Sequence, residues 1–168
     1  GSFGARNALA LKARLERSAL SVQTEAANVP GARFLVALDY TNTQQVWLRV
    51  VKDPEQRDRQ PEGDHGQWLA TQKPEREWNV QLPDDGDLNS HMVELPVGGL
   101  PFGRYAILVS NSEHFAVGAD VMCYANTWIT NLAFADRSEG TDLDLLVLDR
   151  TSGAPKQRVK VTAFVRNP

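Results

Sequence analysis

The chain of 168 residues has a single cysteine, Cys123, and three histidines. One thiol cannot close an internal disulfide or supply the thiolates of a zinc cluster, so we expect Cys123 to be a small buried hydrophobe. No apolar run reaches the roughly 18 residues that a membrane-spanning helix needs. The net charge of −3 gives no strong field for nucleic acid or an anionic membrane surface. We therefore expect no nucleic-acid partner and no membrane span.

The overall composition is that of an ordinary folded protein. With 42% hydrophobic and 23% charged residues, the length predicts one or two domains of roughly 100 residues each. We interpret the opening Gly1-Ser2 as a tag remnant, and no leader of basic and then apolar residues follows it. The N-terminus therefore does not reveal the compartment.

The first segment has helical periodicity. Ala8, Leu11, Leu15 and Ala19 fall on one helical face, which predicts a short amphipathic helix over roughly residues 6–18. We expect this helix to pack on a neighbouring sandwich or to be left over from an upstream module, in preference to a helix that binds a membrane or a partner.

From Leu20 onward the period changes to two, which is typical of strands. The stretch 53–64 is crowded with charge, Pro and Gly, so we expect a solvated loop there, followed by a short helical turn at 67–70. About seven strands before residue 122 match an antiparallel sandwich of immunoglobulin-like size. These strands are expected at residues 20–25, 33–40, 45–51, 77–82, 91–95, 103–110 and 115–117.

The long apolar stretch 121–135 is interpreted as a crossing into a second sandwich. Strands of that sandwich are expected near residues 127–135, 142–149 and 157–165, the last two joined by a turn at 149–155. The alternative is that all strands form one larger sandwich. The predicted division is a tag remnant and helix at 1–19, a complete sandwich at 20–122 and a partial second sandwich at 123–168.

Three turn-and-strand segments carry a family resemblance. Leu100-Pro101-Phe102-Gly103-Arg104-Tyr105 resembles the entry to a late strand of macroglobulin domains, and Val29-Pro30-Gly31 resembles the turn before their second strand. The turn 149–155, followed by Val159-Lys160-Val161, resembles the hairpin that opens many such domains. With the lead-in at 128–133, the chain resembles a fragment of a bacterial alpha-2-macroglobulin-family protein. The fold implied is an all-β, immunoglobulin-like or macroglobulin antiparallel β-sandwich with a short N-terminal helix and the opening strands of a second sandwich.

The resemblance implies a non-catalytic structural module of a large protease-trapping inhibitor in the periplasm or cell envelope. Its partners would be neighbouring domains of the same parent chain, and its targets would be proteases. Many members carry a reactive thioester between Cys and Gln. Cys123 is followed by Tyr124-Ala125-Asn126 without the required Glu-Gln pair, so no thioester is carried over to this chain.

No catalytic or metal-binding constellation is predicted, so we expect no enzyme and no cofactor. His65, His91 and His114 are far apart in the sequence and are expected at surface or edge positions. The run Asp84-Asp85-Gly86-Asp87 has the appearance of a calcium loop. It lacks the closing Glu of the twelve-residue motif and is expected to be a solvated turn.

The alternative function is a carbohydrate- or protein-binding module of a cell-envelope protein. Trp47 and Trp128 lie in apolar segments and are expected in the core, whereas Trp68 and Trp78 flank the charged loop and form a possible contact surface. Tyr105 is expected to bury its ring and keep its hydroxyl hydrogen-bonded. Exposed, coplanar indoles would favour the binding module, and an apolar surface near residues 123–134 would favour the structural one.

Overall fold

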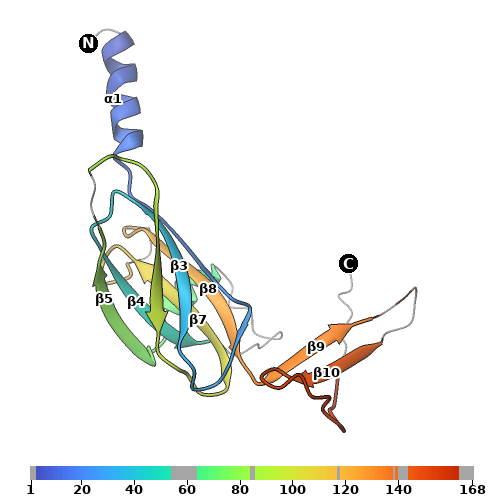
Figure 1. Ribbon diagram of the computed structural model, residues 1–168. Helices are drawn as coiled ribbons and strands as arrows, with labels where there is room; N and C mark the ends of the chain where they lie inside the picture. The colour runs from blue at the N-terminus through green and yellow to red at the C-terminus, as the bar shows by residue number, and fades with distance from the viewer. Residues whose placement is uncertain are drawn as a thin grey trace. The chain divides into compact units, whose positions relative to one another are not determined.

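A computed structural model describes residues 3–53, 64–83, 86–116, 118–137, 139 and 144–162 (Figure 1). The chain divides into two compact units, Gly1–Ile129 and Thr130–Pro168. The elements of the first unit are α1 (Phe3–Leu15), β1 (Ala19–Thr24), β2 (Ala27–Asn28), β3 (Phe34–Thr41), β4 (Gln45–Lys52), α2 (His65–Thr71), β5 (Arg76–Gln81), β6 (His91–Val97), β7 (Gly103–Ser110) and β8 (Met122–Ile129). Those of the second unit are β9 (Leu132–Asp136) and β10 (Leu145–Asp149).

The first unit is a β-sandwich. One sheet has the strand order β1-β3-β6, and the other has the order β2-β8-β7-β4-β5. All pairs are antiparallel except the two-residue pair of β2 with β8, which is parallel. The expectation of an all-β sandwich is thereby confirmed.

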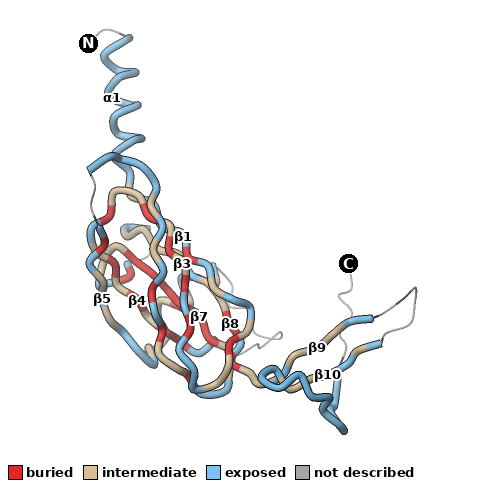
Figure 2. The backbone as a smooth tube through the Cα atoms, viewed as in Figure 1, coloured by how far each residue is buried: buried red, intermediate tan, exposed pale blue. Residues whose placement is uncertain are grey.

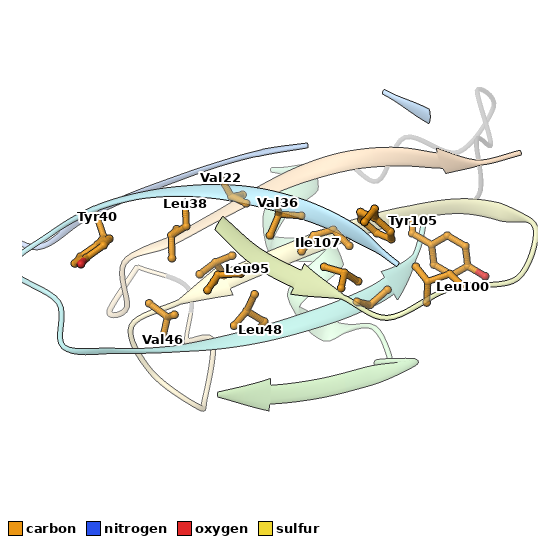
Figure 3. Packing of buried hydrophobic residues seen from close by; sticks show 14 of the residues in the cluster. Val22, Val36, Leu38, Tyr40, Val46, Leu48, Leu95, Leu100, Tyr105 and Ile107 are labelled. Carbon is orange, nitrogen blue, oxygen red and sulfur yellow. The ribbon is translucent and has the colours of Figure 1, made fainter. Parts of the chain in front are cut away.

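The core lies between the two sheets because alternate side chains of each strand point inward. In β3, for example, Phe34, Val36, Leu38 and Tyr40 are buried while the residues between them are more exposed. Figure 3 shows this packing in the space between the strands. The main buried cluster consists of Val22, Phe34, Val36, Leu38, Tyr40, Val46, Leu48, Val50, Leu82, Leu95, Val97, Leu100, Tyr105, Ile107, Val109 and Ile129.

A second, smaller cluster covers part of the other face of the five-stranded sheet. It joins Val51 of β4 and Leu108 of β7 to Leu69 of α2 and to Phe115. We call this face, which points away from the main core, the outer face. Helix α2 and the Phe115 loop are therefore held against it by apolar contacts.

The predicted strands of the first unit match β1 and β3–β7 closely, but the strand expected at 115–117 is wrong. Phe115 has a positive φ of 50°, which an extended strand does not allow. Its ring is buried in the second cluster, and the Arg49 guanidinium lies 4.1 Å from the ring centroid. Tertiary packing therefore fixes a turn there; residue 117 lies outside the described residues.

Strand β8 completes the first sandwich instead of starting a second one. It pairs with β7 along its whole length, from Gly103 opposite Ile129 to Ser110 opposite Met122. Along the sequence, the boundary between the two compact units lies after Ile129, whereas the expected boundary was after residue 122.

The second unit is a two-stranded antiparallel sheet of β9 and β10. After β10 the chain turns back, and Lys156 N donates to Val147 O at 2.9 Å. The strand expected at 157–165 is wrong over residues 157–162, where no strand forms. Arg158 has a φ of +59°, which interrupts an extended chain. Residues 163–165 lie outside the described part.

Helix α1 is present as predicted, but its stripe does not cover a surface of the sandwich. Every residue from Gly4 to Leu15 is exposed (Figure 2). The end of the helix is held by Asn42 at the β3–β4 corner, whose Nδ2 donates to Leu15 O and Arg17 O at 2.6 and 3.0 Å. No helix in the described ranges is long and apolar enough to cross a membrane.

Candidate functional site

A carboxylate is buried on the outer face of the five-stranded sheet. Asp53 follows β4, and its N–H donates to Arg104 O at 3.1 Å, which continues the β4–β7 ladder by one residue. Strand alternation places Asp53 on the same face as Val51. Only 1% of Asp53 is exposed, so the expectation that the charged stretch is solvated from Asp53 onward is wrong. Residues 54–63 lie outside the described part.

Three side chains surround the Asp53 carboxylate. His65 Nε2 lies 3.2 Å from Oδ1, and Arg104 Nη2 lies 3.5 Å from Oδ2. With its amide oriented to satisfy both neighbours, Asn126 donates to Asp53 Oδ2 at 3.3 Å and accepts from Arg104 Nη2 at 3.2 Å. A buried charge is tolerated where a counter-charge and hydrogen bonds compensate its desolvation. Arg104 and Asn126 fulfil that role here.

Aromatic rings flank this polar group on both sides. The His65 ring stacks on Trp68 at 5.4 Å between centroids, and it meets Tyr124 edge-on at 5.9 Å. The Arg104 guanidinium lies 5.9 Å from the Trp128 ring centroid. We refer to the seven residues together as the outer-face cluster: Asp53, His65, Trp68, Arg104, Tyr124, Asn126 and Trp128.

Strand β8 contributes three of these residues through its period of two. Tyr124, Asn126 and Trp128 alternate with Cys123, Ala125, Thr127 and Ile129, so they share the outer face. Tyr124 is 36% exposed and Trp128 is 44% exposed. The cluster is thus anchored on a buried carboxylate and presents an indole and a phenol to solvent.

Helix α2 brings His65 and Trp68 to the cluster. Asp64 caps the helix by accepting from Gly66 N at 2.9 Å. A Cβ at position 66 would lie 3.1 Å from Tyr124 Cε1, a spacing tighter than ordinary contact. Glycine at this position lets the first turn of α2 pack directly on Tyr124.

The structure does not bring Trp68 and Trp78 together as one platform. Trp78 of β5 packs against the main core between the sheets, whereas Trp68 packs against the second cluster on the outer face. Trp47 is half-buried against that second cluster. The expectation that Trp128 belongs to the core is wrong, because β8 points Ile129 inward and Trp128 outward.

The other predicted polar residues lie apart from the cluster. His91 Nε2 lies 2.8 Å from Asp87 Oδ1, and His114 is exposed beside Glu113. Hydrogen bonds from Asn89 and then from His91 lower the pKa of Asp87 to about 2. Asp84 and Asp85 lie outside the described residues. Within the described ranges no three His, Cys, Asp or Glu side chains gather as a metal site.

Cys123 occupies the inner side of β8. It is partly buried and packs against the main core, and burial raises the pKa of its thiol to about 12. The expectation of a small buried hydrophobe is confirmed in part, because Cys123 packs on the core but is only partly buried.

No protein-family model matches this chain, and a search of curated proteins finds no match. Sequence reasoning missed Asp53, Arg104, Tyr124 and Asn126 as partners. The one signal in the sequence is the alternation Tyr124-Asn126-Trp128, which an outward-facing strand would display on one side.

Proposed function

We propose that this chain is a non-catalytic structural module of an alpha-2-macroglobulin-like protease-trapping inhibitor that works in the periplasm or cell envelope. The strand order is the observation that carries the proposal. With β1 and β2 taken as the two parts of strand A, β3, β4, β5, β6, β7 and β8 correspond to B, C, C′, E, F and G. The sheets are then ABE and A′GFCC′, which is the partition expected of an immunoglobulin-like sandwich.

Two of the three segments that resemble macroglobulin domains support the proposal by their positions. Gly31, with a φ of +72°, turns the chain into β3. Leu100 is buried at the entry to β7, and Tyr105 lies near the start of that strand. The turn 149–155 follows β10 and folds the chain back on it, with a bridge between Leu148 and Pro155. The first two positions support the proposed family, whereas the turn at 149–155 is not followed by the strand at Val159-Lys160-Val161 that the resemblance implies.

The second unit supports contact with a further protein domain. Its two strands are apolar on both faces: Phe134 and Val147 are directly opposite on one side, and Ala135 and Leu146 on the other. Phe134 is 72% exposed. An isolated two-stranded sheet is marginally stable in water, and strands apolar on both faces are typical of covered sheets. Neighbouring domains of the same parent chain are the proposed cover.

Protease trapping by the full-length natural protein tests the proposal. The protein is incubated with several endoproteases, and residual activity is measured on a small chromogenic peptide and on a large protein substrate. Selective loss of activity on the large substrate is expected, because a trapped protease remains accessible to small molecules only. The 168-residue chain alone is the control and should not protect the large substrate. Equal activity on both substrates with the full-length protein would overturn the proposal.

A further inference from the structure

We infer that the outer-face cluster is a binding site for an uncharged oligosaccharide. The inference does not depend on the proposed structural function, because every residue of the site belongs to the first unit. The cluster presents the partly exposed side chains of Tyr124 and Trp128 on one face of β8, with the amide of Asn126 between them.

The aromatic residues supply the packing surfaces that sugar rings need. The face of an indole or phenol ring carries partial negative charge, so it attracts the weakly positive C–H bonds on the flat side of a pyranose. Tyr and Trp also keep a polar edge that is compatible with water. Tyr124 is 36% exposed although α2 packs on it, and Trp128 is 44% exposed although the Arg104 guanidinium lies over its ring. The solvent-facing part of each ring is the surface that we assign to a sugar.

The charge balance of the cluster argues for an uncharged ligand. The carboxylate of Asp53 is 2% exposed and faces the Arg104 guanidinium, so the cation already has its counter-charge inside the protein. An anionic ligand would compete with Asp53 for Arg104 and would leave a buried carboxylate without compensation. An uncharged ligand with hydroxyl groups leaves the Asp53–Arg104 pair intact and can still hydrogen-bond to the exposed edges of the polar side chains in the cluster.

The spacing of the two exposed rings points to a chain of sugars instead of a single ring. Tyr124 and Trp128 are four residues apart on one strand, which separates their Cα atoms by about 13 Å. We therefore assign the two rings to different sugars of one chain. Asn126, midway between them, has its amide engaged by Asp53 and Arg104, so this centre is held fixed before a ligand arrives, which lowers the ordering cost of binding.

Calorimetry on the 168-residue chain tests the inference, with β-1,4-linked oligomers of glucose, xylose and N-acetylglucosamine and a galacturonate oligomer as the anionic comparator. We expect binding of at least one uncharged oligomer and weaker binding of its monosaccharide. Trp128→Ala and Tyr124→Ala should each weaken that binding by at least about tenfold. Phe134→Ala, which removes an exposed ring from the second unit, is the matched control and should leave it unchanged.

Trp128→Phe keeps an aromatic face at the same position, so it distinguishes a loss of binding from a loss of folding. It should retain most of the affinity that Trp128→Ala loses, with unchanged circular dichroism in both variants. Three results would overturn the inference: no uncharged oligomer binds, only the galacturonate oligomer binds, or the affinity of Trp128→Ala equals that of the unmodified chain. The trapping assay above is independent of each of these results.

Discussion

His65 Nε2 lies 3.2 Å from Oδ1 of Asp53, whose side chain is 2% exposed. The contact joins the first residue of α2 to the residue that follows β4, and it lies against the Arg104 and Asn126 side chains. A buried carboxylate of this kind is costly to desolvate, so its partners matter for stability as well as for the shape of the surface. The contact between His65 and Asp53 therefore helps to hold α2 against the five-stranded sheet.

Removal of the Asp53 carboxylate should destabilise the sandwich. Asp53→Ala leaves the partly buried Arg104 guanidinium without its counter-charge, so we expect a loss of about 2–3 kcal/mol in the free energy of unfolding. Urea denaturation followed by circular dichroism measures it. Glu94→Gln, an exposed charge on β6, is the control and should change stability by less than about 0.5 kcal/mol. A change as small in Asp53→Ala would contradict the assigned role of the carboxylate.

Two tyrosines at opposite ends of the core should respond differently to loss of the hydroxyl (Figure 3). Tyr40 Oη donates to Pro83 O at 2.9 Å, so Tyr40→Phe should cost about 1 kcal/mol. The Tyr105 hydroxyl is buried and has no hydrogen-bond partner among the residues that the structure describes, which corrects the expectation of a bonded hydroxyl. Burial accordingly raises the pKa of this phenol.

Tyr105→Phe removes a polar atom that is desolvated without compensation. We therefore expect unchanged or higher stability, by up to about 1 kcal/mol, in the same denaturation measurement. The opposite signs of the two Tyr→Phe changes are the critical outcome. A loss in Tyr105→Phe as large as that in Tyr40→Phe would mean that the Tyr105 hydroxyl is hydrogen-bonded in solution.

A close approach of two loops depends on glycine at position 99. A Cβ there would overlap the backbone carbonyl of Gly31, whose own N–H donates to Leu100 O at 2.9 Å. Because backbone cannot move aside as a side chain does, Gly99→Ala should destabilise the sandwich by about 1–3 kcal/mol. At Gly98 an added Cβ meets only the end of the flexible Arg76 side chain.

Gly98→Ala is thus the matched control, with a smaller expected loss. Thermal unfolding of the two variants side by side measures the difference. Equal melting temperatures would show that the two loops separate readily and that the contact contributes little.

Strands such as β3 were predictable because they bury one face, and a period of two in the sequence is the direct consequence. β7 is buried on both faces and is instead marked by a continuous apolar run. The period does not say which face is inside. Trp128 and Ile129 are adjacent apolar residues, and only pairing of β8 with β7 decides that Ile129 enters the core. The local sequence also predicted that Asp53 is solvated, because the partners that compensate its charge lie on distant segments, namely β7, β8 and α2. Phe115 and Arg158 adopt positive φ angles, which are uncommon for these residue types and cannot be predicted from them.

Cys123 should react very slowly as a thiol in the folded chain. Burial raises its pKa from 9.0 to about 12, and the thiolate is the reactive form. Near pH 8 its thiolate fraction should be lower than that of an unfolded cysteine by a factor on the order of a thousand. Ellman's reagent, added with and without denaturing urea, measures the two rates. Native and unfolded rates within a few-fold of each other would contradict the burial.

The same pKa shift makes stability fall with rising pH. Between about pH 9 and pH 12 the unfolded chain loses the Cys123 proton while the folded chain keeps it, so the folded state binds more protons. Stability therefore decreases as pH rises through this window and is unaffected by this group below it. Cys123→Ala removes the titrating group and leaves other alkaline effects in place. From pH 8 to pH 10.5 the unfolding free energy of the unmodified chain should fall by more than that of Cys123→Ala. An equal fall in both chains would show that the thiol ionises normally.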